Sequence, residues 1–225
     1  MRQKLPALFF LLSLMGAVIS VQASESPIYR TCQEQPDRQQ ARSRELQRLV
    51  QDDQKEREDW DQLSEEEKQN VSCHDESRRK RVGEIFGEGC LKEAQDYAAA
   101  SLIYQHGDVP DHYFQAFLWA KRAVDSGDLS SKGLVAMTID RYLVSQGQKQ
   151  LFGTQAFASE ETGWCFCLQP VERSFPDLKR IAYGDKTLAD RLDDLASFNQ
   201  GKSCPNTECA MALNETPAGS VPGFW

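Results

Sequence analysis

The sequence lacks the short motifs that mark the common catalytic and nucleotide-binding sites. It contains no G-x-S-x-G, no H-E-x-x-H, no Walker loop and no Rossmann glycine fingerprint. Histidine, the side chain whose ordinary pKa lies nearest to neutrality, occurs only three times. Motifs therefore name neither a reaction nor a ligand, and the polar residues have to be weighed by their positions.

Positive charge is also scarce. The chain carries 26 Lys and Arg residues against 34 Asp and Glu residues, which gives a formal net charge of −8. Proteins that bind the phosphate backbone of nucleic acids need a cationic surface. The acidic balance therefore excludes nucleic acid from the partners that we expect.

Beyond its first twenty or so residues the chain has no long apolar run. The start combines a basic segment (MRQK), an apolar core (LPALFFLLSLMGAVIS) and small residues before Ser24, the pattern of a cleaved signal peptide. A membrane anchor is the alternative, but the apolar core is short for a span of about 20 residues. We predict a signal peptide over residues 1–23, cleavage near Ala23–Ser24, and a periplasmic or secreted protein without a transmembrane span.

All seven cysteines follow the predicted cleavage point, and export favours disulfide bonds. The candidates are Cys32, Cys73, Cys90, Cys165, Cys167, Cys204 and Cys209. The last two could close a small loop, whereas the two cysteines of C-F-C would each pair elsewhere. An odd count leaves one thiol free or intermolecular. The spacings do not match paired C-x2-C zinc knuckles, so we expect no metal and no other cofactor.

The mature chain is long enough for one domain with its own core. We predict an N-terminal segment over 24–35, a single helical domain over 36–200 and a cysteine-containing tail over 201–225. The fold class is mainly α, built from antiparallel αα-hairpins, with a small β-hairpin near 149–170 where apolar and polar residues alternate. The last residues, NETPAGSVPGFW, are expected to be flexible.

Apolar residues recur at helical spacing through most of this domain. Helices are predicted within residues 41–60, 75–89, 91–108, 110–128, 130–147, 174–185 and 187–198. Ser64 is a candidate N-cap at the start of the stretch LSEEEKQN, and Val82, Ile85 and Phe86 would point inward from the helix within 75–89. The helix within 130–147 is apolar on two sides, which predicts a central position.

Two predicted helices carry charged residues within their apolar faces. In the first helix, steps of three and four residues from Leu46 reach Asp53 and Arg57, an acid–base pair four residues apart. In the central helix, Arg141 lies in an apolar row and Asp140 flanks another. A buried ion pair is a poor source of stability because desolvation offsets the attraction. Each pair is therefore either structural or part of a site.

The stretch GQKQLFGTQAF (147–157) interleaves amides with apolar residues where a plain loop would serve. Gln150, Thr154 and Gln155 could cap helix ends and bridge loops, or they could orient a ligand beside His106. Histidine is the best candidate for a general acid or base, with a neighbouring aspartate to orient it. The candidate catalytic residues are His106 and Asp140. The candidate ligand-binding residues are Asp53, Arg57, Gln105, Arg141, Gln150, Thr154 and Gln155.

In order and spacing these residues resemble a bacterial family of uncharacterised domains. Its members carry a D-Q-x-x-R helix, a Q-H-[AG]-D helix end, then D-R, then G-x-x-Q-x-[YF]-G-[TS]-Q. The matching residues are Asp53, Gln54, Arg57, Gln105, His106, Asp108, Asp140, Arg141, Gly147, Gln150, Phe152, Gly153, Thr154 and Gln155. The likeness runs from about residue 40 to 195. It implies a helical fold and candidate residues, without a reaction, and Phe152 replaces a tyrosine and so lacks its hydroxyl.

A shorter segment, AAASLIYQHGDVPDHYFQAFLWAKRAVDSGD, resembles one repeat of the Sel-like branch of tetratricopeptide repeats. A solenoid needs about three such units to bury a continuous core. The resemblance therefore implies a single αα-hairpin and not an array.

The preferred hypothesis is a non-catalytic helical domain of the bacterial envelope, whose partner is another envelope protein or a small polar ligand. The first alternative is a metal-independent hydrolase that uses His106 with Asp53 or Asp140 and with Gln155. The second is a disulfide-stabilised secreted effector or inhibitor. An enzyme requires the polar residues to converge in one open cleft. A binding module should instead keep them satisfied and expose an apolar patch elsewhere.

Overall fold

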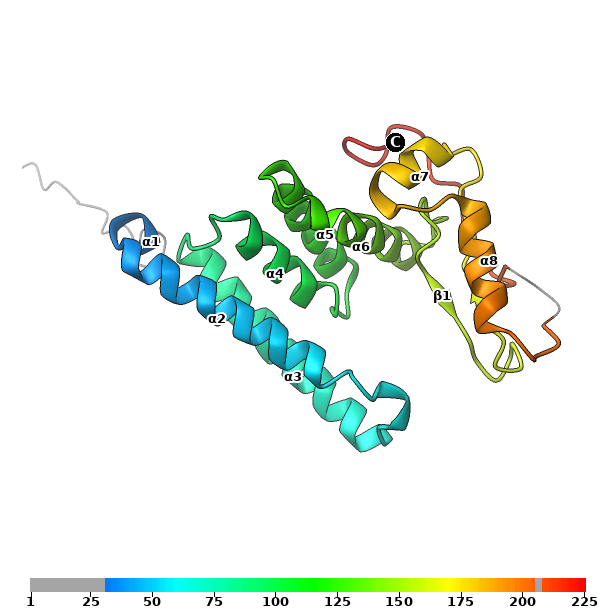
Figure 1. Ribbon diagram of the computed structural model, residues 1–225, viewed down its shortest axis with the longest axis horizontal. Helices are drawn as coiled ribbons and strands as arrows, with labels where there is room; N and C mark the ends of the chain where they lie inside the picture. The colour runs from blue at the N-terminus through cyan, green and yellow to red at the C-terminus, as the bar shows by residue number, and fades with distance from the viewer. Residues whose placement is uncertain (1–30, 205–207) are drawn as a thin grey trace, which may run out of the picture.

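The computed structural model describes residues 31–204 and 208–225, so the predicted signal peptide lies outside the described residues. The described residues form eight α-helices, two short 3-10 turns and one two-stranded sheet, which confirms the mainly α prediction. In Figure 1, α2 and α3 lie at one end, α4 to α6 in the middle, and α7, α8 and the sheet at the other end. No helix within the described ranges is long and apolar enough to cross a membrane.

The N-terminal part is a long antiparallel helical hairpin (Figure 1). Its elements are α1 (Thr31–Glu34), α2 (Pro36–Lys55), the 3-10 turn η1 (Trp60–Gln62) and α3 (Glu65–Gly87). Ser64 caps α3 as predicted, because its hydroxyl accepts from the backbone N–H of Glu67 while the Glu67 carboxylate accepts from the backbone N–H of Ser64. A disulfide between Cys32 and Cys90 ties α1 to the end of this hairpin.

The prediction is wrong for one core residue of α3. Val82 and Ile85 are fully buried, but Phe86 is 54% exposed. One residue further round a helix is about 100° away, so the position after Ile85 faces partly into solvent. The Phe86 ring instead lies against the edge of the core, 5.6 Å from the ring of Trp119.

The middle of the molecule consists of α4 (Ala94–Tyr104), α5 (Pro110–Asp125), the 3-10 turn η2 (Leu129–Ser131) and α6 (Lys132–Ser145). α4 and α5 form the αα-hairpin that the sequence predicts, and α5 packs on α6. Small side chains on these helices, such as Ala116 and Ala120, are fully buried and let the backbones approach closely. On α6, the buried face is Val135, Ala136, Ile139 and Leu143, as predicted.

The C-terminal part contains the small sheet and two short helices. They are β1 (Ala156–Phe157), β2 (Cys167–Leu168), α7 (Asp177–Gly184) and α8 (Leu188–Phe198). The strands pair antiparallel, with Ala156 opposite Leu168 and Phe157 opposite Cys167. The predicted β-hairpin is therefore present, with strands of only two residues each.

The cysteine pairing corrects one expectation. Cys204 and Cys209 do not pair with each other, since Cys165 binds Cys204 and Cys167 binds Cys209. The two cysteines of C-F-C thus pair elsewhere, as expected, and both bonds tie the sheet region to the chain that follows α8. Cys73 on α3 is the unpaired thiol and is exposed.

The expectation of a flexible C-terminal end is wrong. Val221 and Phe224 are buried, and the Phe224 ring packs 4.5 Å from that of Tyr183. The indole N–H of Trp225 donates to the carbonyl of Thr216 at 2.9 Å. Prolines and glycines gave this segment the composition of a loop, but its aromatic side chains complete the core between α5, α6 and α7.

Candidate functional site

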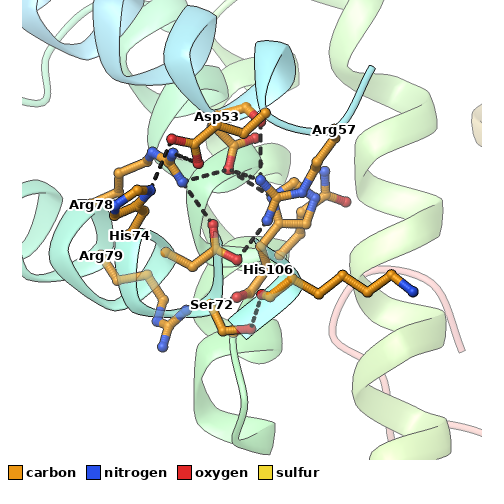
Figure 2. A network of polar contacts seen from close by, with 12 residues as sticks. Asp53, Arg57, Ser72, His74, Arg78, Arg79 and His106 are labelled. Carbon is orange, nitrogen blue, oxygen red and sulfur yellow. Dashed lines mark hydrogen bonds and ion pairs between the residues drawn. The ribbon is translucent and has the colours of Figure 1, made fainter. Parts of the chain in front are cut away.

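The centre of the site is a buried carboxylate on the last turn of α2. Asp53 has no solvent exposure. Its Oδ1 accepts from Nη1 of Arg57 at 2.9 Å and lies 3.0 Å from Nδ1 of His106, while Oδ2 accepts from Nε2 of Gln54 at 2.7 Å. Figure 2 shows Asp53 directed at Arg57 and His106. The acid–base pair that the apolar face of α2 predicts is therefore present, and it extends to His106.

Side chains of α3 continue the network on the other side. Nη2 of Arg57 donates to Oδ2 of Asp75 at 2.5 Å, and Nη1 of Arg78 donates to Oδ1 of the same carboxylate at 2.9 Å. Arg78 also pairs with Glu56 and lies 3.7 Å from Asp53. Carboxylates and guanidinium groups thus alternate between the two helices, so that each buried charge has an opposite neighbour (Figure 2).

Sequence reasoning missed the α3 members of this network. The signal was present, because Val71, Asp75, Arg78, Val82 and Ile85 recur at steps of three and four and all are buried. Two charges therefore interrupt the apolar stripe of α3 just as Asp53 interrupts that of α2.

The turn between α4 and α5 holds His106 in place. The carbonyl of His106 accepts from Nη1 of Arg79 at 2.7 Å, and the carbonyl of Gly107 accepts from the hydroxyl of Tyr113 at 2.7 Å. A Cβ at Gly107 would lie 2.3 Å from the Cβ of His112, so no larger residue fits without moving the backbone. The histidine ring is therefore fixed from its own backbone as well as by Asp53.

Arg141 approaches the same turn from α6. Its Nη1 donates to the carbonyl of Gln105 at 2.6 Å, its Nε donates to Oε1 of Gln155 at 3.3 Å, and its guanidinium carbon lies 6.0 Å from the centre of the Tyr113 ring. All three contacts are neutral. Among the described residues no carboxylate lies within 4.0 Å of this guanidinium.

The remaining predicted residues shape a loop and do not reach His106. The buried carboxylate of Asp140 accepts from the backbone N–H groups of Leu151, Phe152 and Thr154 at 2.8, 3.0 and 3.0 Å, and from the Thr154 hydroxyl at 2.9 Å. Asp140 is therefore not available to orient His106, because its oxygens are occupied by the loop. The expectation that the two would act together is wrong.

Gln150 has a similar structural role. Its Nε2 donates to the carbonyls of Gln155 and Gln169 at 2.8 and 2.7 Å, and its Oε1 accepts from the N–H of Gln155 at 2.8 Å. Gly153 has a φ of +72°, a conformation that favours glycine. The amide-rich stretch is thus a loop held from inside, and it presents the side chain of Gln155 to Arg141.

Together these elements enclose a pocket of about 360 Å³. Its lining residues are Arg57, Trp60, Ser72, Asp75, Gln105, His106, Gly107, Tyr113 and Arg141. They come from the turn after α2, from η1, α3, the α4–α5 turn, α5 and α6. Trp60 is 40% exposed, so the pocket meets solvent on its side.

The charges of the network shift the acidity of its members. Burial acts to raise the pKa of Asp53, but the hydrogen bond and charge of His106 and the charge of Arg57 outweigh it and lower the pKa below its ordinary value. Burial lowers the pKa of Arg141, and the positive charge of Arg57 acts in the same direction. The environment of Asp53 thus stabilises its charged form, whereas the environment of Arg141 disfavours the charged form.

Asp53, Asp75 and His106 place one potential metal-ligand atom each within 4.8 Å of one another. Their oxygens already accept from Arg57 and Arg78 at hydrogen-bonding distance. A divalent cation would have to displace both guanidinium groups. The donor set therefore fits an ion-pair network better than a metal centre.

A separate apolar groove of about 870 Å³ lies between η2, the start of α6, the sheet, α7 and α8. Leu129, Ile181 and Phe198 on its rim are 63%, 47% and 70% exposed. It shares no lining residue with the polar pocket. Exposed apolar side chains of this size commonly mark surfaces that meet another molecule.

Of the predicted site residues, Asp53, Arg57, Gln105, His106, Arg141 and Gln155 meet at or beside the pocket, while Asp140, Gln150 and Thr154 build its supporting loop. Comparisons with protein-family models, with curated proteins and with solved structures find no match to this chain. The chemistry of the pocket is therefore the basis on which a function can be proposed.

Proposed function

We propose that this chain is an exported, non-catalytic binding domain of the bacterial envelope that holds a small polar ligand in the pocket between Arg57, His106 and Arg141. The observation that carries the proposal is that most charges of the converging side chains already pair with one another, while an apolar groove lies exposed elsewhere. Polar side chains from three helices and from the two segments that join α2 to α3 and α4 to α5 line one small open pocket, although they lie far apart in the sequence. Largely preformed pockets with a few converging polar groups are the usual form of small-molecule sites.

The energetics of the network support a role beyond stability. Asp53 is fully buried, and Arg78 is 6% exposed. Removing such charges from water costs several kcal/mol per ion, and their mutual attraction recovers this only in part, so apolar residues would often serve stability as well. Groups kept at such a cost are candidates for a function that needs them.

The lining also has the composition that recognition of a polar molecule requires. Arg57 and Arg141 are donors, and Trp60 and Tyr113 offer aromatic faces. His106 and Gln105 add further polar groups on the turn. This combination would orient a small ligand and select it by its charge.

The proposal is tested by nuclear magnetic resonance on the exported, oxidised protein with a library of small polar compounds. We expect at least one compound to shift the backbone signal of Gly107 and the indole N–H signal of Trp60 in a saturable manner. The matched control is Arg44→Gln, an exposed arginine on α2 outside the pocket, which should leave binding unchanged. If every saturable shift maps to the apolar groove, the pocket is not the binding site.

A second candidate function, a hydrolase, is favoured by the Asp53–His106 contact. A carboxylate at 3.0 Å from Nδ1 holds a histidine in the form whose Nε2 can accept a proton, as in serine hydrolases. Ser72 lines the same pocket. The test is turnover of chromogenic esters, phosphates and glycosides by the wild type and by His106→Asn. Turnover that His106→Asn retains in full would exclude this histidine as the base.

A protein partner is the other form that a binding domain could take, and the apolar groove would be its surface. A photo-reactive residue at Phe198, on the groove, should then capture one discrete envelope protein in the native host. Leu178 is 83% exposed and does not line the groove, so it provides the control position. Equal capture from both positions would contradict a specific surface.

A further inference from the structure

We infer that the ligand of the polar pocket is a small organic monoanion with a carboxylate group, and that Arg141 is the residue that binds this carboxylate. The inference rests on the proposed binding function and adds the charge and the class of the ligand. Its basis is that Arg141 has no acidic partner among the described residues, in a network where neighbouring arginines have one.

The contrast with the other arginines of the network is direct. Arg57 lies 2.9 and 2.5 Å from the carboxylates of Asp53 and Asp75, and Arg79 lies 3.2 Å from that of Asp108. Arg141 has no carboxylate within 4.0 Å among the described residues. A guanidinium removed from bulk water without a counter-charge is unfavourable, and an anion in the pocket would supply that charge.

Arg141 keeps free hydrogen-bond donors for a carboxylate. A guanidinium has five N–H donors. Arg141 uses one on the carbonyl of Gln105 and one on the amide oxygen of Gln155, and its Nη2 has no protein acceptor within the described ranges. The planar fork of arginine binds a carboxylate through two parallel N–H donors, which a neutral ligand cannot match in strength.

The charge balance of the wall favours a single negative charge. Arg57 and Arg141 line the pocket together with only one carboxylate, that of Asp75, which Arg57 and Arg78 already pair. One monoanion would neutralise the unpaired guanidinium. A dianion such as phosphate would bring a second negative charge close to Asp75.

The aromatic side chains indicate the rest of the ligand. Trp60 is 40% exposed at the pocket, and the Tyr113 ring lies beside the Arg141 guanidinium. Flat organic groups pack well on such faces. With a volume of about 360 Å³, the pocket has room for a compound of about one ring and lies at the small end of ligand sites.

The test compares three probes of one shape and different charge on the full exported protein at constant ionic strength. They are benzoate, its neutral isostere benzamide and the cation benzamidine. Inorganic phosphate is the fourth probe. We expect benzoate to shift the Nε–H signal of Arg141, the backbone signal of Gly107 and the indole N–H signal of Trp60 in a saturable manner. Benzamide should bind at least about tenfold more weakly, because it removes one charge-assisted contact.

Variants then assign the charge to its residue. Arg141→Gln should weaken benzoate binding by about tenfold or more, while Arg141→Lys should retain part of it and Arg44→Gln, with the same change in net charge, all of it. Circular dichroism confirms that each variant folds. If Arg141→Gln does not fold, the comparison of benzoate with benzamide on the wild type still tests the charge of the ligand, and the Nε–H signal of Arg141 still tests where benzoate binds.

Four results would overturn the inference, and each contradicts a different part of it. Equal or tighter binding of benzamide or benzamidine at these signals would reject an anionic ligand while keeping a polar binding pocket. Tighter binding of phosphate would replace the monoanion by a dianion. Unchanged benzoate binding by Arg141→Gln would remove Arg141 from the site. No saturable shift at these signals with any probe would reject both the inference and the proposed pocket.

Discussion

Asp53 and His106 are separated by 53 positions in the sequence, yet Oδ1 of the aspartate lies 3.0 Å from Nδ1 of the histidine. The contact joins the last turn of α2 to the turn between α4 and α5. Because Asp53 also binds Arg57, a single carboxylate fixes one wall of the pocket and the end of its helix. The stability of the domain and the shape of the pocket thus depend on the same group.

Asp53→Asn should lower the free energy of unfolding by about 3 kcal/mol, because it leaves Arg57 and its neighbours without one buried counter-charge. Urea unfolding followed by circular dichroism measures the change. Asp52→Asn is the matched control, since Asp52 is the adjacent aspartate on α2 and is exposed. Equal effects of the two substitutions would mean that the buried network contributes nothing specific.

Arg141→Met should leave the free energy of unfolding unchanged or raise it by about 1 kcal/mol, because within the described part of the chain the arginine has no acidic partner to lose. Arg180→Met should lower it by about 3 kcal/mol. Arg180 is 2% exposed, pairs with Asp177 and donates to the carbonyls of Leu151 and Glu172. Similar losses in both variants would show that Arg141 is a structural residue.

The protein should lose stability in acid. Hydrogen bonds from Arg42 and Arg81 lower the pKa of Glu88 and of Glu45, and His106 and Arg57 lower that of Asp53 against the effect of burial. A carboxyl whose pKa is lower in the folded state stabilises it at pH values above its unfolded pKa, about 4, and this contribution disappears as the pH falls through the folded pKa.

The free energy of unfolding should therefore vary little with these carboxyls between pH 7 and about pH 5 and fall steadily below about pH 4. Urea titrations at a series of pH values measure this profile. In Asp53→Asn the decline should be shallower, because one of the groups is gone. A stability that increases on acidification would contradict the shifts assigned to these carboxyls.

The native protein should take up one alkyl group per chain from iodoacetamide, at Cys73, because the other six cysteines form three disulfides. Intact-mass spectrometry counts the adducts. Cys73→Ser should take up none before reduction. Several adducts on the unreduced wild type would show that one of the three bonds does not form.

Local patterns predicted the helices because each one carries its own signals. The row from Leu46 to Asp53 on α2, the cap at Ser64 and the proline at the start of α5 act within a few residues, so a single sequence displays them. The same local rule failed at Phe86, where the exposure of a side chain depends on how a neighbouring helix covers the edge of the stripe.

The parts of the site that escaped prediction depend on contacts between distant segments. Asp75 and Arg78 were missed although they interrupt an apolar row on α3, and only the packing of α3 on α2 shows what they pair with. Asp140 was proposed to orient His106 because an aspartate commonly does so. In the fold its carboxylate instead accepts hydrogen bonds from the loop at 150–155. Cysteine pairing likewise depends on topology, as the bond between Cys167 and Cys209 shows.

The packing of Phe224 has a consequence for the order in which the molecule can be made. Its ring lies 5.8 Å from that of Phe117 and 6.0 Å from that of Phe152, so the core between α5, α6 and α7 includes a side chain that is synthesised 107 positions after Phe117 and 72 positions after Phe152. The core between α5, α6 and α7 is complete only after residues 221–225 have been synthesised. A chain halted shortly before them would leave an aromatic cavity open to solvent.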